Sequence, residues 1–315
     1  MDWNNRVTEI LGSRYPIMQG AYQGFGTSAI AAPVSEAGAF GVITAHCFRS
    51  PEKLRDDIRR ARAMTDRPFG VNFSVGFVPL LDEMVEVVIE ESVPVVETSV
   101  SRGDEVGRRA QAAGLKWVHK AASVDHVLSA ARHGADAITI VGIEGIGFKN
   151  PTQLPTLTAV SWLVRQTDTP VIAAGGIGDA RTFAAALCAG AEGICMGTAF
   201  LATNECPMPE SRKKALVQAS PRDDVYRRMA LSGPDAGDYE RVMAERDSMP
   251  VDKWLRRLEK VTLGQSPDGP MKTKSMAKGS LAVAFIDEVV PVKGLIDSIV
   301  SGAEQLLNDR LPGRL

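Results

Sequence analysis

Eight short apolar runs, separated by amphipathic segments, constrain the fold of this chain more than any other feature. The runs cover residues 16–21, 40–45, 69–75, 93–100, 116–123, 137–142, 170–176 and 193–200. Most of the segments between them begin with Ser, Thr or Asp and several end at Gly, as helices do. Strands that alternate with helices of this length pair in parallel, and eight such units close into a barrel. We therefore predict an α/β fold, a single (β/α)8 TIM barrel.

An open, doubly wound sheet is the rival fold. No GxGxxG motif follows the first run, whereas glycine-rich turns follow the seventh and eighth runs, where barrels bind phosphate. Residues 203–280 are rich in Met, Arg, Asp and Pro and have helical segments but no clear strand. We predict a barrel from residues 1–202 and 281–315, and a helical insertion over 203–280 that covers the barrel mouth as a lid. The tail returns to an amphipathic helix that closes the barrel wall.

Composition limits the class of partner. The net charge is −2, and no dense run of Lys or Arg appears, so neither nucleic acid nor a membrane surface is an expected partner. A small-molecule substrate fits better. No segment has the pattern of a secretion signal or a membrane span, so we expect a cytoplasmic protein. The 4 cysteines form no CxxC pair and no metal-binding spacing, and we predict no metal site. A homodimer is compatible with the sequence, which does not fix the oligomeric state.

Two glycine-rich turns follow the last two predicted strands. Gly175 and Gly176 allow backbone N–H groups to approach an anion closely, and a helix predicted to begin just after them directs its positive end to the same place. Gly197 and Thr198 would add N–H and hydroxyl donors from the next strand. Tight turns without a ligand are the alternative. Because the two turns lie on adjacent strands, we predict a phosphate site between them.

Two polar side chains interrupt predicted strands that are otherwise apolar. Asn72 in PFGVNFSV must find hydrogen-bond partners, and we interpret it as a ligand contact rather than a structural hydrogen bond. Lys120 in KWVHKAAS either pairs with a buried carboxylate or faces an electron-rich ligand such as a reduced flavin, and we favour the flavin. His119 alternates to the other side of that strand and is expected to pack beneath a helix.

Further candidates follow the first two predicted strands. The glycines of PIMQGAYQGFGTS let the main chain lie against a flat ligand, to which Gln19 or Tyr22 could donate a hydrogen bond. His46 follows the second strand directly and therefore stands on the catalytic face of the barrel, which makes it the best acid/base candidate. No Ser/His/Asp or HExxH arrangement supports hydrolysis or zinc chemistry.

At this point the chain resembles a known family, the nitronate monooxygenases, once called 2-nitropropane dioxygenases, together with the related FMN-dependent enoyl-acyl-carrier-protein reductases. The resemblance rests on PIMQGAYQGFGTSAIAAPVSEAGAFGVITA, RPFGVNF, HKAASVDHVLSAARHGADAITIVG and PVIAAGGIGDARTFAAALCAGAEGICMGTAFLAT. It implies a barrel that binds FMN without a covalent link. The residues implied to line the flavin are Gly20, Ala21, Tyr22, Asn72, Lys120, Gly142, Gly175, Gly176, Gly197 and Thr198. FMN is expected rather than FAD because no Rossmann fingerprint is present.

One position departs from this family. After the sixth predicted strand the family reads G-x-E-x-G-G-H-x-G, with a histidine that serves as acid/base near the flavin, whereas this chain reads GIEGIGFKN and has Phe148 there. Removing a positioned acid/base typically costs about 10²–10⁴ in rate. Glu144 remains at the family's glutamate position and is expected to organise the loop. Tyr22, His46 or Lys149 would have to supply a proton where a reaction needs one.

The resemblance implies an FMN-dependent oxidoreductase that oxidises a small nitronate-like substrate with oxygen. A nitronate is already deprotonated, so its oxidation tolerates the loss of the histidine. The alternative is an NAD(P)H-dependent flavin reductase acting on the activated C=C bond of an enoyl thioester or a quinone. A flavin-binding protein with little turnover is a third reading. The catalytic candidates are His46, Lys120 and Tyr22.

Basic residues in or near the insertion raise the question of a larger substrate. They would suit the phosphates of a CoA or acyl-carrier thioester or of a pyridine dinucleotide, although a solvated helix face is the simpler interpretation. These residues are Arg212, Lys213, Lys214, Arg227, Arg228, Lys272 and Lys274.

Overall fold

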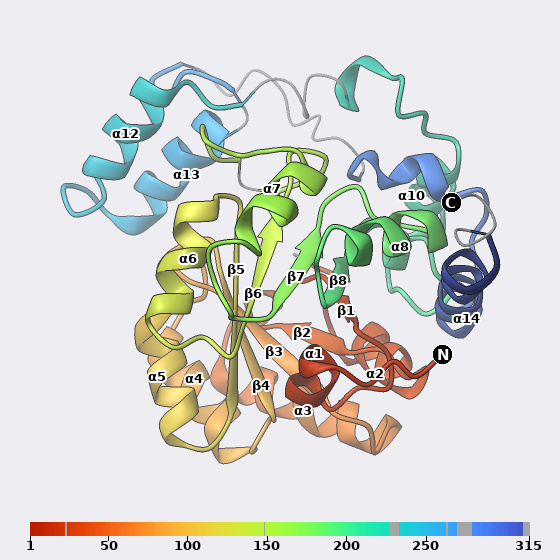
Figure 1. Cartoon of the computed structure of the whole chain (residues 1–315). Coiled ribbons are helices and arrows are strands. Elements are labelled where there is room, and N and C mark those ends of the chain that lie inside the picture. Colours follow the sequence, from red (N-terminus) through yellow and green to blue (C-terminus); the bar gives the residue numbers. More distant parts are fainter. Residues whose placement is uncertain (23, 148, 227–232, 263, 270–278, 311–315) are drawn as a thin grey trace.

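The computed structural model describes residues 1–22, 24–147, 149–226, 233–262, 264–269 and 279–310. Eight parallel strands form one sheet in the order β1-β8-β7-β6-β5-β4-β3-β2. The strands are β1 (Ile17–Gln19), β2 (Gly41–Thr44), β3 (Phe69–Ser74), β4 (Val95–Ser99), β5 (Lys116–Ala121), β6 (Ala137–Val141), β7 (Val171–Ala174) and β8 (Gly193–Met196). Between β1 and β2, Phe40 donates its amide to Ile17 O and accepts from Gln19 N, both at 2.8 Å. The sheet is therefore a nearly closed barrel with helices around it, and the predicted fold is confirmed (Figure 1).

The last predicted strand was too long. The run 193–200 was expected to be extended throughout, but β8 ends at Met196 and the short helix α9 (Thr198–Leu201) begins almost at once. Gly197 has helical dihedral angles, with φ −105° and ψ −65°, which ends the extended backbone. The apolar character of this segment continues through α9 because Ala199 and Phe200 are buried.

Helices alternate with the strands, as predicted. Ser50, Ser123 and Asp179 cap three of them by accepting hydrogen bonds from the amides of Lys53, His126 and Thr182. The helices that accompany the barrel are α1 (Arg6–Leu11), α2 (Ser28–Glu36), α3 (Pro51–Met64), α4 (Leu81–Glu90), α5 (Asp104–Ala112), α6 (Val124–Arg132), α7 (Thr156–Leu163) and α8 (Ala180–Cys188). A 3₁₀ turn, η1 (Ala45–Cys47), follows β2.

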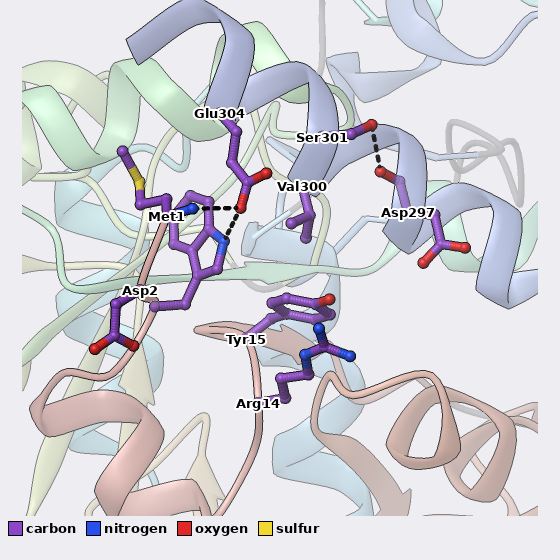
Figure 2. Close-up of a pocket in the computed structure, with 9 residues that line it drawn as sticks. Met1, Asp2, Arg14, Tyr15, Asp297, Val300, Ser301 and Glu304 are labelled. Atoms are coloured by element: carbon purple, nitrogen blue, oxygen red, sulfur yellow. Dashed lines mark hydrogen bonds and ion pairs between the residues drawn. The ribbon is translucent and has the colours of Figure 1, made fainter. Parts of the chain in front are cut away.

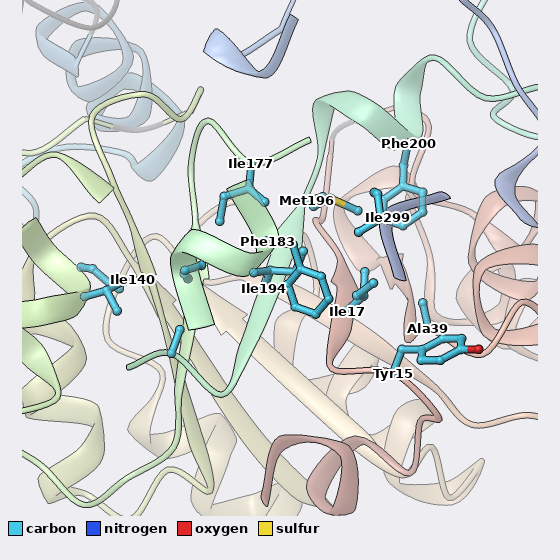
Figure 3. Packing of buried hydrophobic residues seen from close by; sticks show 14 of the residues in the cluster. Tyr15, Ile17, Ala39, Ile140, Ile177, Phe183, Ile194, Met196, Phe200 and Ile299 are labelled. Carbon is cyan, nitrogen blue, oxygen red and sulfur yellow. The ribbon is translucent and has the colours of Figure 1, made fainter. Parts of the chain in front are cut away.

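Apolar side chains fill the barrel and the layer outside it separately. Inside, residues from the strands pack on Val7 and Leu11 of α1, so this helix closes the amino-terminal end of the barrel. These interior strand residues are Met18, Val42, Val95, Val118, Ala137, Ile172, Ala174 and Cys195. Outside, Ile194 of β8 packs with Phe183 of α8 and Ile299 of the C-terminal helix (Figure 3). At the carboxyl ends of the strands, polar side chains such as Asn72, Glu97 and Lys120 take the place of this apolar packing.

The C-terminal segment completes the wall. Residues 281–285 form a 3₁₀ helix, η2 (Leu281–Phe285), followed by α14 (Val292–Gln305) and the π-helical turn η3 (Leu306–Arg310). Helix α14 packs against α8 and α2, as expected for a helix that closes the barrel wall. A Cβ on Gly302 would lie 2.6 Å from the Cβ of Ala180, so the glycine permits the close approach of α14 to α8.

The insertion is helical in its described residues. It contains α10 (Glu210–Val217), α12 (Ala236–Ala244) and α13 (Val251–Thr262), and no strand is present in the described part of 203–280. Helices α12 and α13 pack on each other around Trp254 and Leu258, which form a small core separate from those of the barrel. Figure 1 shows the two helices side by side outside the ring of strands. Across the ranges the structure describes, no helix is long and apolar enough to cross a lipid bilayer.

Candidate functional site

A buried polar network lies at the carboxyl ends of β3, β4 and β5. Asn72 Nδ2 donates to Glu97 Oε2 at 2.6 Å and to Ser99 Oγ at 3.1 Å. Lys120 Nζ donates to the same Glu97 oxygen at 2.8 Å. Strand register sets this arrangement, because Asn72 is opposite Glu97 and Ser99 is opposite Lys120. Three strands thus direct amide, carboxylate and ammonium groups to one place inside the barrel mouth.

The network has unsatisfied polar atoms. Glu97 Oε1 is buried without a hydrogen-bond partner in the described residues, and so is the Thr139 hydroxyl on β6. Thr139 lies opposite Lys120 in the strand register. A buried polar group without a hydrogen-bond partner costs about 1–3 kcal/mol of stability, and a charged group costs more. The network is therefore incomplete by itself and suited to a ligand or water that supplies the missing partners.

Charge holds the network together. Burial lowers the pKa of Lys120, but the negative charge of Glu97 more than offsets this effect and the net pKa is raised. Burial raises the pKa of the neighbouring Cys195 thiol to about 12, so this group stays neutral. Lys120 therefore carries a full positive charge beside Glu97 at neutral pH.

The structure shows protein partners for Lys120 and Asn72, both of which were interpreted above as ligand contacts. Lys120 does pair with a buried carboxylate, the interpretation that was not favoured, and Asn72 does make structural hydrogen bonds. Contact of either residue with a ligand stays a prediction. Sequence reasoning missed Glu97, although the rule that singled out Asn72, a polar group in an apolar strand, applies equally to VPVVETSV.

The two glycine turns after β7 and β8 lie at the same end of the barrel. Gly175 and Gly176 have positive φ values of 103° and 71°, so both need glycine. Among the described residues, the amides of Gly176, Gly197 and Thr198 have no hydrogen-bond acceptor, so their N–H groups could bind an anion. Helix α8 begins just beyond, capped by Asp179. The predicted phosphate donors are thus backbone amides on adjacent strands.

The Thr198 hydroxyl is not a free donor. It donates to Ser280 Oγ at 2.9 Å and accepts from Ser280 N at 2.9 Å. A Cβ on Gly279 would lie 2.3 Å from Thr198 Cγ2, so the returning chain packs tightly on this threonine. The Thr198 hydroxyl therefore joins the start of α9 to the C-terminal segment, and its contact with a phosphate stays a prediction.

The loop after β1 lies beside the end of β2. A Cβ on Gly20 would be 3.3 Å from Gly197 Cα, so the two loops approach closely. Tyr22 N donates to Thr44 Oγ1 at 3.2 Å. The Tyr22 hydroxyl is buried without a described partner, and burial raises its pKa. Gln19, which lies near this hydroxyl, already uses its carboxamide on the Val42 backbone.

His46 stands after β2, at the carboxyl end of the barrel, as predicted. Its Nδ1 lies 2.9 Å from Phe77 O, and its ring meets the Phe77 ring edge to face. The next residue, Cys47, contacts the Tyr22 carbonyl through its thiol at 3.7 Å. The turn that bears His46 therefore adjoins the loop that bears Tyr22.

The loop after β6 is tied to α7 by Glu144. A Cβ on Gly142 would be 2.0 Å from Thr156 Oγ1, which gives Gly142 a packing reason apart from any flavin contact. Lys149 is buried and donates to Ile143 O at 2.5 Å and Gly145 O at 2.8 Å. Burial lowers the pKa of Lys149 to about 8. Phe148, which stands at the family's histidine position, lies outside the described residues.

The remaining histidines are placed as expected. His119 is buried, and its Nδ1 lies 2.8 Å from Thr98 Oγ1, on the opposite side of β5 from Lys120. Burial lowers its pKa to about 4. His126 and His133 are exposed on α6 and its end.

The insertion touches loops at the carboxyl end of the barrel. Asn150 Nδ2 lies 3.4 Å from the Tyr239 hydroxyl of α12. Arg246 lies 3.3 Å from Ser101 Oγ, just after β4. These contacts are compatible with the proposed lid over the barrel mouth.

Only part of the basic set can be placed. Arg212 is exposed and lies over the Phe25 ring at 6.0 Å. Lys213 is buried and bonds to Asn204 O and to the Glu210 carboxylate, so for this residue the solvated-face interpretation is wrong. Lys214 is exposed. The rest lie outside the described residues: Arg227, Arg228, Lys272 and Lys274.

A surface hollow of about 440 Å³ lies elsewhere (Figure 2). It is formed by the N-terminal residues, by Arg14 and Tyr15 before β1, and by α14. The N-terminal amine and Trp3 Nε1 both bond to Glu304 there. Because the hollow is at the amino-terminal end of β1, it does not belong to the polar network.

The fold and the site define an α/β-barrel protein with a buried polar network at the carboxyl ends of the strands. The nitronate monooxygenase family model matches residues 4–84 and 75–302, and the chain belongs to this family. It is a family of flavin-dependent oxidoreductases.

Three relatives illustrate the range of the similarity. A probable nitronate monooxygenase of Staphylococcus aureus is 32% identical over 275 residues, which is 73% of this chain and 77% of that protein. A Mycobacterium tuberculosis protein, 5-hydroxy-7a-methyl-1-oxo-octahydro-1H-indene-4-carboxyl-CoA dehydrogenase, is 33% identical over 68% of this chain. The match spans only 60% of that dehydrogenase. A variant of FabK from Thermotoga maritima has a similar structure, with a TM-score of 0.78, 33% identity, and coverage of 99% of this chain and 100% of the other.

Proposed function

We propose that this chain is an FMN-dependent oxidoreductase of the nitronate monooxygenase type, which oxidises a small nitronate-like substrate with oxygen. The observation that carries the proposal is the network of Lys120, Glu97 and Asn72 at the barrel mouth, beside loops that offer backbone amides to a phosphate. The family match supports it.

The described residues fit a flavin. Backbone amides of Gly176, Gly197 and Thr198 would hold the phosphate, and one phosphate on one barrel site favours FMN over a dinucleotide. Lys120 would place a cation near the ring, and the buried Tyr22 hydroxyl offers a further polar contact. The bound flavin would supply the electron exchange between the substrate and oxygen.

The missing family histidine favours a substrate that needs no proton removed. A nitronate enters already deprotonated, so the chain's own residues need only bind and orient it. The Lys120 ammonium, the more exposed member of its ion pair with Glu97, would donate a hydrogen bond to the anion, and the helices of the insertion would limit its contact with water. His46 and Tyr22 remain the candidates for donating a hydrogen bond to a substrate oxygen.

Purified protein tests this proposal. We expect a flavin band near ~450 nm, FMN as the released cofactor, and anaerobic bleaching by an alkyl nitronate without any pyridine nucleotide. A His46→Gln variant should keep this reaction within a few-fold of the wild-type rate, with His126→Gln, at an exposed position on α6, as a matched control. A colourless protein that cannot be reconstituted with FMN would contradict the proposal.

A second candidate function is reduction of an activated C=C bond, as in an enoyl thioester or a quinone, with NAD(P)H as donor. The observation that favours it is Lys149, next to the family's histidine position, because its pKa is lowered to about 8 and it can therefore release a proton near neutral pH. The similarity to a carboxyl-CoA dehydrogenase and to FabK is compatible with a thioester substrate.

Bleaching by NADH or NADPH alone, followed by reoxidation with crotonyl-CoA, would favour this reductase over the monooxygenase. Lys149→Met should then slow only the reoxidation, by about 10²–10⁴ if Lys149 is the proton donor. The nitronate reaction of the same variant serves as its control.

A further inference from the structure

Glu97 contacts two candidate flavin residues at once and is more deeply buried than Lys120. Its side chain is 1% exposed, whereas that of Lys120 is 14% exposed. Asn72 and Lys120 both donate to Glu97 Oε2. Glu97 can therefore act on a ligand at the mouth through these two neighbours.

The groups around Lys120 leave Glu97 as its counter-charge. From β8 the Cys195 thiol faces the pair, and burial raises its pKa to about 12. Within β5, burial lowers the pKa of His119 to about 4. From β6 comes Thr139, which does not titrate. His119 and Cys195 are therefore neutral between pH 6.5 and pH 9.5, which leaves Glu97 as the partner of Lys120 in an ion pair.

Burial and charge act on Lys120 in opposite directions. Burial favours its neutral amine, and Glu97 reverses that preference. Without Glu97 the ammonium would therefore lose its proton at a lower pH than in the wild type. Below that pH the barrel would hold an unpaired cation, which is the arrangement that a buried ion pair avoids.

We propose that Glu97 is a positioning residue that fixes both the place and the charge of Lys120, so that a bound flavin faces a neutral ion pair instead of a free cation. The proposal rests on the flavin site proposed above, and it is independent of the substrate. It predicts that the redox potential of the flavin is insensitive to the titration of Lys120 in the wild type. Loss of Glu97 would create that sensitivity.

The test compares reconstituted holoproteins: wild type, Glu97→Gln, Glu97→Asp and, as a matched control that removes a carboxylate far from the barrel mouth, Glu9→Gln at an exposed position on α1. The midpoint potential of the flavin is measured by dye equilibration from pH 6.5 to pH 9.5. At low pH, the ratio of the affinity for reduced flavin to the affinity for oxidised flavin should be at least tenfold higher in Glu97→Gln than in the wild type. That change corresponds to about 30 mV for a two-electron couple. The difference should vanish at high pH, where Lys120 becomes neutral.

The controls separate charge from packing. Glu9→Gln should follow the wild type at every pH, and Glu97→Asp, which keeps the charge, should show less than half of the Glu97→Gln shift. The double variant Glu97→Gln with Lys120→Gln removes both charges and should show no pH-dependent difference. If Glu97→Gln fails to fold while the double variant folds, an unpaired Lys120 cation is the cause, which supports the proposal.

Two outcomes would overturn the proposal in distinguishable ways. A wild-type chain that binds no flavin would remove the proposed function and this inference with it. A wild type that binds flavin, with Glu97→Gln differing from it equally at all pH values or not at all, would reject the role of Glu97 alone.

Discussion

Glu144 accepts hydrogen bonds from both the amide and the hydroxyl of Thr156, at 2.9 Å and 2.7 Å. Thr156 is the first residue of α7, and the residue before it, Pro155, makes no capping bond with its side chain. Glu144, in the loop after β6, therefore caps this helix from a distance. The expectation that Glu144 organises the loop is confirmed.

Replacing Glu144 by Ala should destabilise the protein by about 1–2 kcal/mol, the usual cost of losing a helix cap. The variant leaves the first amide of α7 and the Thr156 hydroxyl without their carboxylate. Urea unfolding followed by circular dichroism measures the change. Glu240→Ala, at an exposed position on α12, is the control and should change the free energy of unfolding by less than about 0.5 kcal/mol. Equal stability of the two variants would contradict the capping role.

Gly176 links this loop to the proposed phosphate site. An alanine there would have its Cβ 2.8 Å from Glu144 Cβ at a φ of 71°, whereas an alanine at Gly114 would have a φ of 82° and nothing within 4 Å. Both variants should lose about 1–2 kcal/mol of stability from backbone strain. Only Gly176→Ala should also weaken FMN binding, by tenfold or more in a fluorescence titration. Unchanged FMN affinity in Gly176→Ala would argue against this turn as the phosphate site.

The fold was predictable because each barrel strand is a separate apolar run. Strands buried on both faces need side chains of one kind, and the helices between them carry their own capping residues, so local sequence is sufficient. Where an apolar run continued into a helix, as after Met196, the boundary was wrong. Apolar character alone does not distinguish a buried strand from a buried short helix.

The site was predictable only where a single residue broke a local pattern. Asn72 and Lys120 stood out in this way, but their shared partner Glu97 was overlooked. The bond between Thr198 and Ser280 joins positions 82 residues apart, and the burial of Lys213 depends on Asn204 and Glu210. Such pairings depend on how distant segments fold together, which no local pattern reports.

The buried Lys149 makes the stability of the protein vary with pH in the alkaline range. Burial lowers its pKa from 10.5 to about 8 in the folded chain, so between these values the unfolded chain binds more protons than the folded chain. The free energy of unfolding contributed by Lys149 therefore rises with pH across this range, by at most about 1.4 kcal/mol per pH unit. Lys149→Met should lack this rise. Urea unfolding of both proteins at pH 7.5 and pH 10 checks it, and the contribution of the other lysines cancels in the comparison.

The buried His119 makes the stability of the protein vary with pH in the acidic range. Its pKa is about 4 in the folded chain against an ordinary value of 6.5, because burial disfavours the charged ring. As the pH falls from about 6.5 towards 4, the unfolded chain takes up this proton first, so the folded state loses stability by up to about 1.4 kcal/mol per pH unit.

His119→Gln removes the titration and keeps a group able to bond to Thr98. The stability of the wild type relative to this variant should therefore be greatest above pH 6.5 and should shrink on acidification. His126→Gln, at an exposed position on α6, is the matched control. Parallel stability curves for the wild type and His119→Gln between pH 4.5 and pH 7 would mean that His119 is not buried in its neutral form.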